Sequence, residues 1–211
     1  MALKKLSDPY VIRASAAVGT VPAGASPTQT ASSSIDTGID SLRREVLAIW
    51  SVQMGYTGAD DNAQMEQCLN SMRDFIVAGT GDSIAARYGV VCTLNKQPQG
   101  LVQTLDNVDV LSIDAVEHNA YAWDFATPAG NDPNFVITTE EFRFPETYDP
   151  NEPTVPLGYV TDSQMEFVTN AFIDGVTTSG TFGGVVGSVK IIAQRMQAAA
   201  ALFAALLTGS Q

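Results

Sequence analysis

Hydrophobic and polar positions alternate most clearly in the segment REVLAIWSVQMGY, residues 44–56. Every second residue from Val46 to Met54 is apolar, and Leu47 and Ile49 lie between them. Successive side chains of a strand point to opposite faces, so this period of two predicts a buried strand with one continuous apolar face from Val46 to Met54, and with Leu47 and Ile49 on the opposite face. The β-branched and aromatic content favours a strand over a helix, and the turn residues that follow end it.

Further segments have the same character, and the connectors between them are rich in Gly, Pro, Asn, Asp and Ser. Short strands spaced by roughly 10–15 residues, with such connectors, are typical of an all-β sandwich or barrel. No helix-length segments alternate with them, which argues against a parallel α/β sheet. The additional strands are expected at residues 63–70, 88–95, 109–117, 120–125, 134–144, 157–162, 165–173 and 184–192.

The start of the chain differs from this pattern. Residues 14–35 carry no charge and consist mostly of Ala, Ser, Thr, Gly and Pro. Such a segment buries too little apolar surface to offset its ordering entropy, so we expect a flexible N-terminal arm over residues 1–40. Up to residue 35 the arm is mildly positive, so it is expected to dock on acidic neighbouring subunits. The charged residues of that part are Lys4, Lys5, Asp8 and Arg13.

The end of the chain differs as well. Residues 194–211 are strong helix formers up to the glycine at 209, which predicts a C-terminal helix and tail after a barrel over residues 41–193. The helix is too short to span a bilayer, and we expect it to pack on its own barrel or on a neighbour; a position at a membrane interface is the alternative. Its apolar stripe is Met196, Ala200, Phe203 and Leu207.

Charge narrows the function classes. The 211 residues include 11 Lys and Arg against 23 Asp and Glu, a net charge of −12. An acidic surface repels phosphates, so sequence-specific binding of nucleic acid is not expected. Acidity with few lysines also suits a salty environment, which makes a marine or halophilic source one expectation.

Targeting and cysteine signals are sparse. Charged residues and Pro9 interrupt any apolar core of a signal peptide, and no run of eighteen apolar residues predicts a transmembrane helix. Cys68 and Cys92 are interpreted as free buried thiols of a reducing compartment, with one disulfide as the alternative. No Cys/His cluster with zinc spacing occurs.

Catalytic signatures are missing from the sequence. The one histidine, His118, is expected at a strand end, as a surface or turn residue. The glycines of GTGDSIAARYG lack the lysine of a phosphate loop, and no GxSxG or HExxH motif is found. The sequence therefore predicts that the chain is not an enzyme and needs no cofactor.

The densest group of carboxylates lies in TEEFRFPETYDPNEP, residues 138–152. Alternation places Glu140 and Glu141 on opposite faces of a strand, so they cannot act as a pair. The motif DPN occurs on either side of this strand and is typical of turns. We therefore expect a strand running into a stiff loop at a subunit boundary. A Ca²⁺ site of flexible loop oxygens is the alternative, with ligands Glu146, Asp149 and Glu152.

The order of these parts resembles a known family. An Ala/Ser/Thr arm precedes IDTGID and the strand REVLAIWSVQM; antiparallel strands, the excursion PETYDPNEPTVPLGYV and a terminal helix follow. This layout resembles the single jelly-roll coat proteins of icosahedral viruses. The resemblance implies a self-assembling capsid subunit that contacts copies of itself and other capsid subunits, is located in the virion, and is assembled in the host cytoplasm. The interface residues expected on this basis are Lys4, Lys5, Arg13, Tyr148, Met196, Phe203 and Leu207.

One departure from that family concerns the arm. Many such coat proteins have a strongly basic arm that neutralises a packaged genome, and this arm has three basic residues. Either another component condenses the genome, or the shell rests on an internal membrane.

Two other functions stay open from the sequence. A carbohydrate-binding β-sandwich could stack sugar rings on Trp50, Trp123 and Tyr121. A glycan or ester hydrolase would need loop carboxylates such as Glu146 and Asp149.

Overall fold

The computed structural model describes residues 3–19, 21–22, 28–57, 83–104, 106–125, 134–145, 155–174, 181–182 and 185–208. These residues form antiparallel strands with one 3-10 turn and one short α-helix, so the prediction of an all-β fold is confirmed. The elements are β1 (Lys4–Lys5), β2 (Tyr10–Ala17), β3 (Val21–Pro22), β4 (Thr28–Asp36), η1 (Ser41–Arg43), β5 (Glu45–Thr57), β6 (Ser83–Asn95), β7 (Val110–Phe125), β8 (Asn134–Pro145), β9 (Gly158–Val160), β10 (Gln164–Asp174), β11 (Thr181–Phe182), β12 (Val186–Gln197) and α2 (Ala200–Thr208).

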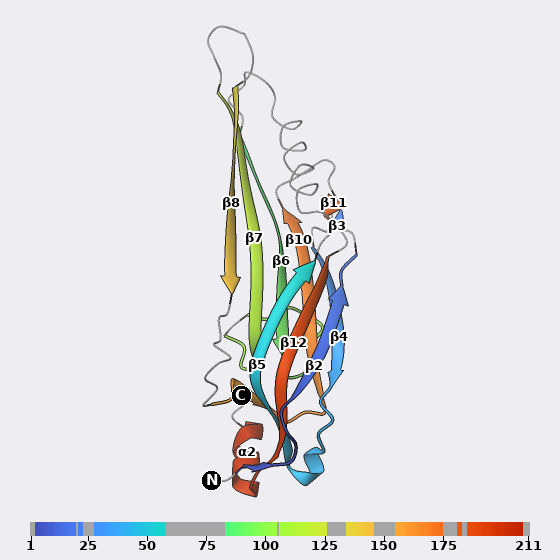
Figure 1. Cartoon of the computed structure of the whole chain (residues 1–211). Coiled ribbons are helices and arrows are strands. Elements are labelled where there is room, and N and C mark those ends of the chain that lie inside the picture. The colour runs from blue at the N-terminus through green and yellow to red at the C-terminus, as the bar shows by residue number, and fades with distance from the viewer. Residues whose placement is uncertain are drawn as a thin grey trace.

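Two five-stranded sheets make up the body of the molecule. One has the order β1-β12-β5-β9, with β2 also paired to β12, and the other has the order β4-β10-β6-β7-β8. We call them the β12 sheet and the β10 sheet. Their strands run along the long axis of an elongated molecule (Figure 1), and β3 and β11 form a separate small ribbon.

The strand pairing identifies a jelly roll. Leaving out the short β1, β3 and β11, the first strand (β2) pairs with the last (β12), β4 pairs with β10, β5 with β9, and β6 with β7. This outside-in pairing of eight strands, distributed alternately between two sheets, is the double Greek key of a jelly roll. β8 is an additional strand that extends the β10 sheet beyond β7. The predicted jelly-roll fold is thus confirmed by connectivity.

The core lies between the two sheets. Apolar side chains alternate inward from both, and the largest fully buried ones include Phe167, Leu47, Ile49 and Leu94. At Gly187 the sheets approach so closely that an added Cβ would collide with Oγ1 of Thr169. A glycine is required there because no side chain fits between the sheets.

A β-bulge changes the alternation expected for residues 46–54. In the pairing of β12 with β5, Ile192 faces Ser51 and Ala193 faces Ile49, so Trp50 is the extra residue. Before the bulge, even-numbered residues point away from the core; after it, Val52, Met54 and Tyr56 pack against the core. The prediction of one continuous apolar face is wrong, because the bulge shifts the phase by one residue.

The N-terminal arm predicted over residues 1–40 is also corrected. β2 and β4 lie within it and are the first two strands of the jelly roll, paired over eight and nine residues with β12 and β10. The composition suggested flexibility because Ala, Ser and Thr are small. Along β2 and β4, however, these residues alternate between the core side and the solvent side of the sheet. Ala16 and Ile35 are buried, and their sequence neighbours Ser15 and Ser34 are exposed. Pairing along a central strand supplies the order that the segment lacks alone.

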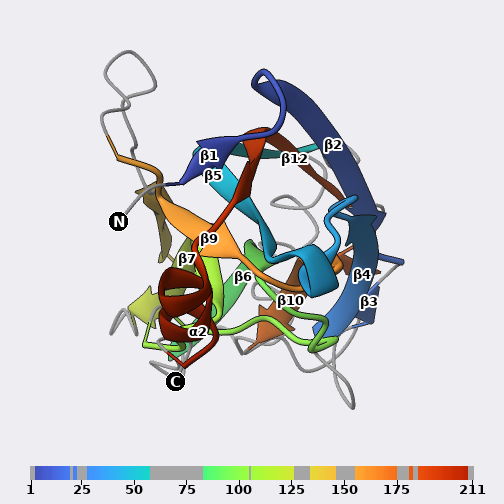
Figure 2. The same cartoon turned by 90° about the horizontal axis from the view of Figure 1, so that it is seen from below.

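The C-terminal region begins later than predicted. Residues 194–197 continue β12, and α2 occupies only Ala200–Thr208. The helix packs on the outer face of the β12 sheet at one end of the molecule (Figure 2), over a cluster of Val46, Ala48, Met196 and Ala198. The expectation that it packs on its own barrel is therefore confirmed.

Other predicted strands are present, but they begin or end at different residues. Segments 109–117 and 120–125 are one strand, β7, so His118 lies inside a strand, opposite Tyr88 and Glu141 in register, and the prediction of a strand end is wrong. The strand expected at residues 63–70 lies outside the described residues.

Candidate assembly surface

One end of the molecule is built from connections that converge there. We call it the base, and it comprises residues 3–9, 36–45, 95–104, 106–110, 155–164 and 197–208. Antiparallel pairing brings these segments together, because the strand ends that they join lie side by side in the register. Figure 2 shows this end with β1, η1, β9 and α2 around it.

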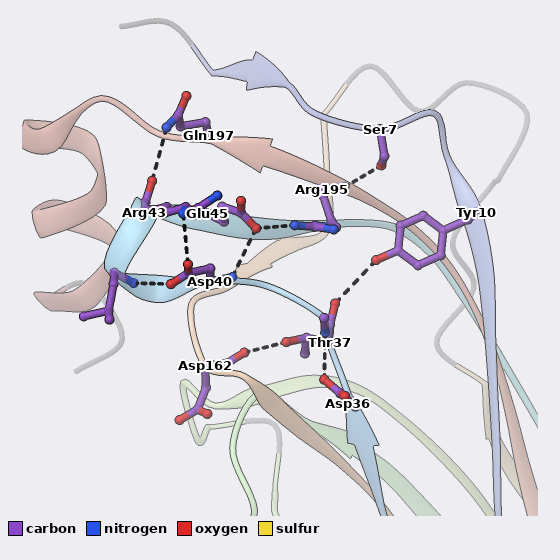
Figure 3. Close-up of polar contacts among 12 residues, drawn as sticks. Ser7, Tyr10, Asp36, Thr37, Asp40, Arg43, Glu45, Asp162, Arg195 and Gln197 are labelled. Carbon is purple, nitrogen blue, oxygen red and sulfur yellow. Dashed lines mark hydrogen bonds and ion pairs between the residues drawn. The ribbon is translucent and has the colours of Figure 1, made fainter.

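A polar network holds the first connection of the base in place (Figure 3). Nη2 of Arg195 lies 2.5 Å from Oε2 of Glu45, which also accepts a hydrogen bond of 3.1 Å from the Asp40 amide. Glu45 is buried, and the hydrogen bond from Arg195 lowers the pKa of its carboxyl group. The ion pair thereby ties β12 to β5 where both strands reach the base.

The same connection turns sharply at η1. The Asp40 carboxylate accepts a hydrogen bond of 3.0 Å from the Leu42 amide, and Arg44 adopts a left-handed conformation with φ of 59°. Thr37 joins the turn to the next connection, because its hydroxyl donates to the Asp162 carbonyl over 2.9 Å. These contacts hold Leu42 outward, with 94% of its surface exposed.

A second connection, between β6 and β7, is fastened by a buried carboxylate. Oε2 of Glu166 accepts hydrogen bonds from the amides of Gln99 at 2.6 Å and Gly100 at 2.7 Å. Gly100 has φ of +70°, a conformation that favours glycine. The turn that results leaves Leu101 61% exposed and Val108 45% exposed.

Exposed apolar side chains therefore gather at the base. Of the eight large hydrophobic residues that are exposed in the described part of the chain, six belong to its segments. Hydrophobic side chains that are held outward together at one end are typical of a contact surface, whereas single scattered ones need no explanation. The six are Leu6, Leu42, Leu101, Val108, Val155 and Leu207.

A groove of about 580 Å³ runs between the last turn of α2 and these connections. Ala205, Leu206 and Leu207 line one side, and Lys96 and Asp109 are among the residues on the other. Its lining is partly polar, so the base combines apolar projections with hydrogen-bonding groups, as protein interfaces do.

The expected interface residues fall into three groups. Lys4, Lys5 and Arg13 are exposed on β1 and β2, and Leu207 is 49% exposed on α2. Met196 belongs to β12 and is buried in the cluster beneath α2, so its expected role at a subunit contact is corrected. Phe203 is half-buried and packs against the same cluster.

The structure describes only part of the acidic stretch at residues 138–152. Glu140 and Glu141 lie on β8, opposite Asn119 and His118. Glu146, Tyr148, Asp149 and Glu152 lie outside the described residues, so the Ca²⁺ site stays a prediction. Within the described residues, no group of three or more His, Cys, Asp or Glu side chains is placed to hold a metal ion.

The structure also shows the positions of residues that the sequence suggested for other functions or for a disulfide. Trp50 is half-buried and packs against the cluster beneath α2, so its ring is not presented for sugar stacking. Tyr121 is 40% exposed on β7. Cys92 is a buried free thiol whose pKa is raised by burial to about 11, and Cys68 lies outside the described residues.

The sequence patterns missed the apolar residues of the base. Leu42, Leu101 and Val108 stand among the polar residues of SLRR, QGLV and DNVD, in connections rather than strands. The signal that could have found these residues is a hydrophobic residue inside a segment of turn-forming residues. None of the described helices is long and apolar enough to cross a membrane.

No protein-family model and no curated protein sequence matches this chain. Solved structures do. The VP1 pentamer of human polyomavirus 7 aligns at 11% identity over 94% of this chain and 100% of that chain, with a TM-score of 0.34. The unassembled VP1 pentamer of KI polyomavirus aligns at 9% identity over 94% and 99%, with a TM-score of 0.35. The assignment of a jelly roll rests on the strand pairing of this chain itself.

Proposed function

We propose that this chain is a structural capsid subunit that assembles with copies of itself, and with other coat proteins, into an icosahedral shell. The observation that carries the proposal is the base, where six large apolar side chains are exposed at one end of a jelly roll and hydrogen bonds fix the turns that carry Leu42 and Leu101. Exposing these groups to water is unfavourable, and contact with a neighbouring subunit removes that cost.

The positions of β1 and α2 support the same function. These first and last described elements both lie at the base (Figure 1), so both are within reach of a neighbour bound there. Jelly rolls serve as capsid, lectin and cupin domains. Of these roles, the cupin role suits the chain least, because cupin metal sites use several histidines and the sequence has one.

Substitutions at the base test the proposal. We expect Leu42→Ser and Leu101→Ser, separately and together, to reduce particle or multimer formation seen by electron microscopy and sedimentation velocity. Both side chains project from turns, so thermal unfolding should change little.

Tyr121→Ser is the matched control, because it removes an exposed ring from the part of β7 that lies far from the base. We expect this variant to assemble as the parent does. Equal assembly of the parent and the Leu42→Ser, Leu101→Ser double variant would contradict a role for the base.

A further inference from the structure

One turn of the base projects a leucine and two arginines into solvent. We call residues 41–44 the SLRR turn; Leu42 is 94% exposed, and Arg43 and Arg44 beside it are exposed as well. The Arg43 side chain lies 3.3 Å from the Asp40 carboxylate, but an ion pair with a side chain that is 77% exposed contributes little. The Arg44 side chain has no hydrogen bond or ion pair within the described part of the chain.

Hydrogen bonds fix the SLRR turn against the end of β12. The Arg43 carbonyl accepts a hydrogen bond of 3.2 Å from Nε2 of Gln197 (Figure 3). The Arg44 carbonyl accepts one of 3.0 Å from the Ala198 amide. Gln197 and Ala198 lead from β12 to α2, so the turn and the helix are held in fixed positions. A surface that is ordered before binding loses little entropy when a partner binds.

The groove of about 580 Å³ at α2 has the complementary character. Its wall on α2 is apolar and includes Leu206 and Leu207, and its other lining residues include the acids Asp109 and Asp162. An apolar side chain flanked by cations therefore matches this groove in both hydrophobicity and charge.

The two carboxylates of the groove are available to a cation. Asp109 and Asp162 accept hydrogen bonds from uncharged groups, and neither forms an ion pair with a described residue. Lys96 is the single cation among the described lining residues, and its Nζ donates a hydrogen bond of 2.6 Å to the Val108 carbonyl. The lining therefore has one negative charge in excess.

We propose that the SLRR turn of one copy of this chain enters the groove of a second copy, while the turn of the second copy enters the groove of the first. In this contact Leu42 packs against the apolar wall on α2, and Arg43 and Arg44 pair with the groove carboxylates. Ser41 belongs to the turn and also lines the groove, so the two surfaces are neighbours on one molecule. A two-fold axis beside Ser41 brings both pairs of surfaces together at once.

The inference rests on the proposed capsid function and names the partner and the symmetry of one contact made by the base. An anionic membrane is a poorer partner, although a leucine beside two arginines also suits a lipid surface. The groove carboxylates would then face lipid phosphates, and the net charge of −12 repels such a surface. A second copy satisfies the turn and the groove together, because each copy supplies what the other lacks.

A charge exchange tests the proposal. Variant A has Arg43→Glu and Arg44→Glu, which makes the turn acidic. Variant B has Asp109→Lys and Asp162→Lys, which makes the groove basic. Sedimentation velocity measures the association of each variant alone, of their equimolar mixture and of the parent, and thermal unfolding checks that each variant is folded.

We expect A alone and B alone to associate at least about tenfold more weakly than the parent, because each brings like charges together in both halves of the contact. The equimolar mixture should recover association. The acidic turn of A then meets the basic groove of B, and the unchanged turn of B meets the unchanged groove of A.

A matched control changes the same net charge elsewhere. Arg13→Glu with Lys190→Glu lies on the outer face of the β12 sheet, away from the base, and should associate like the parent. If variant B does not fold, Asp109→Asn with Asp162→Asn takes its place, because the amide keeps a hydrogen-bond acceptor. That variant should also associate more weakly than the parent.

Three outcomes would overturn the inference: a variant A that associates like the parent, a mixture of folded A and B no more associated than its parts, or an A variant that loses only binding to anionic vesicles. Assembly of the parent with failure of the exchange rejects this contact and leaves the capsid function standing. A parent that forms only exchange-sensitive pairs, and nothing larger, keeps the contact and rejects the capsid function.

Discussion

Gly187 allows the two sheets to approach at a point where no side chain fits. An added Cβ would collide with Oγ1 of Thr169 and lie 3.0 Å from Sγ of Cys92. Thr169 is β-branched and fully buried, so its side chain has little freedom to move aside.

We expect Gly187→Ala to lower the free energy of unfolding by about 1–3 kcal/mol, as overpacking does in other cores. Urea unfolding measures the change. Gly55→Ala is the control, because its nearest neighbour would be Oγ of Ser188 at an unstrained 3.9 Å. Thr169→Ala should recover part of the loss in the double variant; if the two effects simply add, the proposed collision is wrong.

Glu45 makes the stability of the fold depend on pH, and its contacts determine in which direction. The hydrogen bond from Arg195 lowers its pKa in the folded state below that of an unfolded glutamate, about 4.3. The ion pair therefore stabilises the fold fully above that value, and this contribution is lost as the pH falls through the lower pKa of the folded state.

We expect Glu45→Gln to unfold at lower urea concentration than the parent at pH 7, and the gap to narrow as the pH falls below about 4. The difference between the two proteins isolates this carboxyl group from the other acids, which titrate in both. A gap that stays constant from pH 7 to about pH 3 would show that the charge of Glu45 is not what matters.

At the residue scale, the sequence predicts which positions are apolar and that they alternate along a strand, but it does not predict where the alternation breaks. The apolar positions of β5 are recognisable, yet the bulge at Trp50 is visible only once β12 is paired beside it. The fastening of the 96–109 connection by Glu166 is equally hidden, because carboxylate and turn lie 66 residues or more apart in the chain.

At the scale of the elements, α2 covers an apolar strip that the β12 sheet would otherwise expose. Leu202, Phe203 and Leu206 pack against the cluster of Val46, Ala48, Met196 and Ala198. The stripe predicted from the sequence included Leu207 instead, which faces outward at the edge of the groove.

We expect Phe203→Ala to reduce stability by about 1–2 kcal/mol, less than a fully buried ring would lose. Leu207→Ala on the same helix is the control and should change stability by no more than about 0.5 kcal/mol while weakening assembly. Thermal unfolding and sedimentation separate the two effects. Equal loss of stability in both variants would mean that the helix does not pack as described.

Element predictions succeeded where side chains are large and alternate, as in β5, β10 and β12. They failed for β2 and β4, whose Ala, Ser and Thr residues have little apolar surface of their own. Those strands owe their order to pairing with distant partners, Ala31 with Thr169 for example, and a local pattern contains no information about a partner.

At the scale of the whole molecule, the jelly roll separates functions by surface. Its interior is apolar and closed, whereas its base combines exposed apolar side chains with polar groups. A subunit of a shell needs such distinct surfaces because each must meet a different neighbour, whereas a monomer has no use for the exposed leucines of the base.

Electron microscopy of the purified parent chain over a range of concentration and salt tests the capsid function most directly. We expect regular multimers, sheets or shells whose amount rises with concentration. A population of single monomers under every condition, including in the presence of its partner coat proteins, would contradict the central claim.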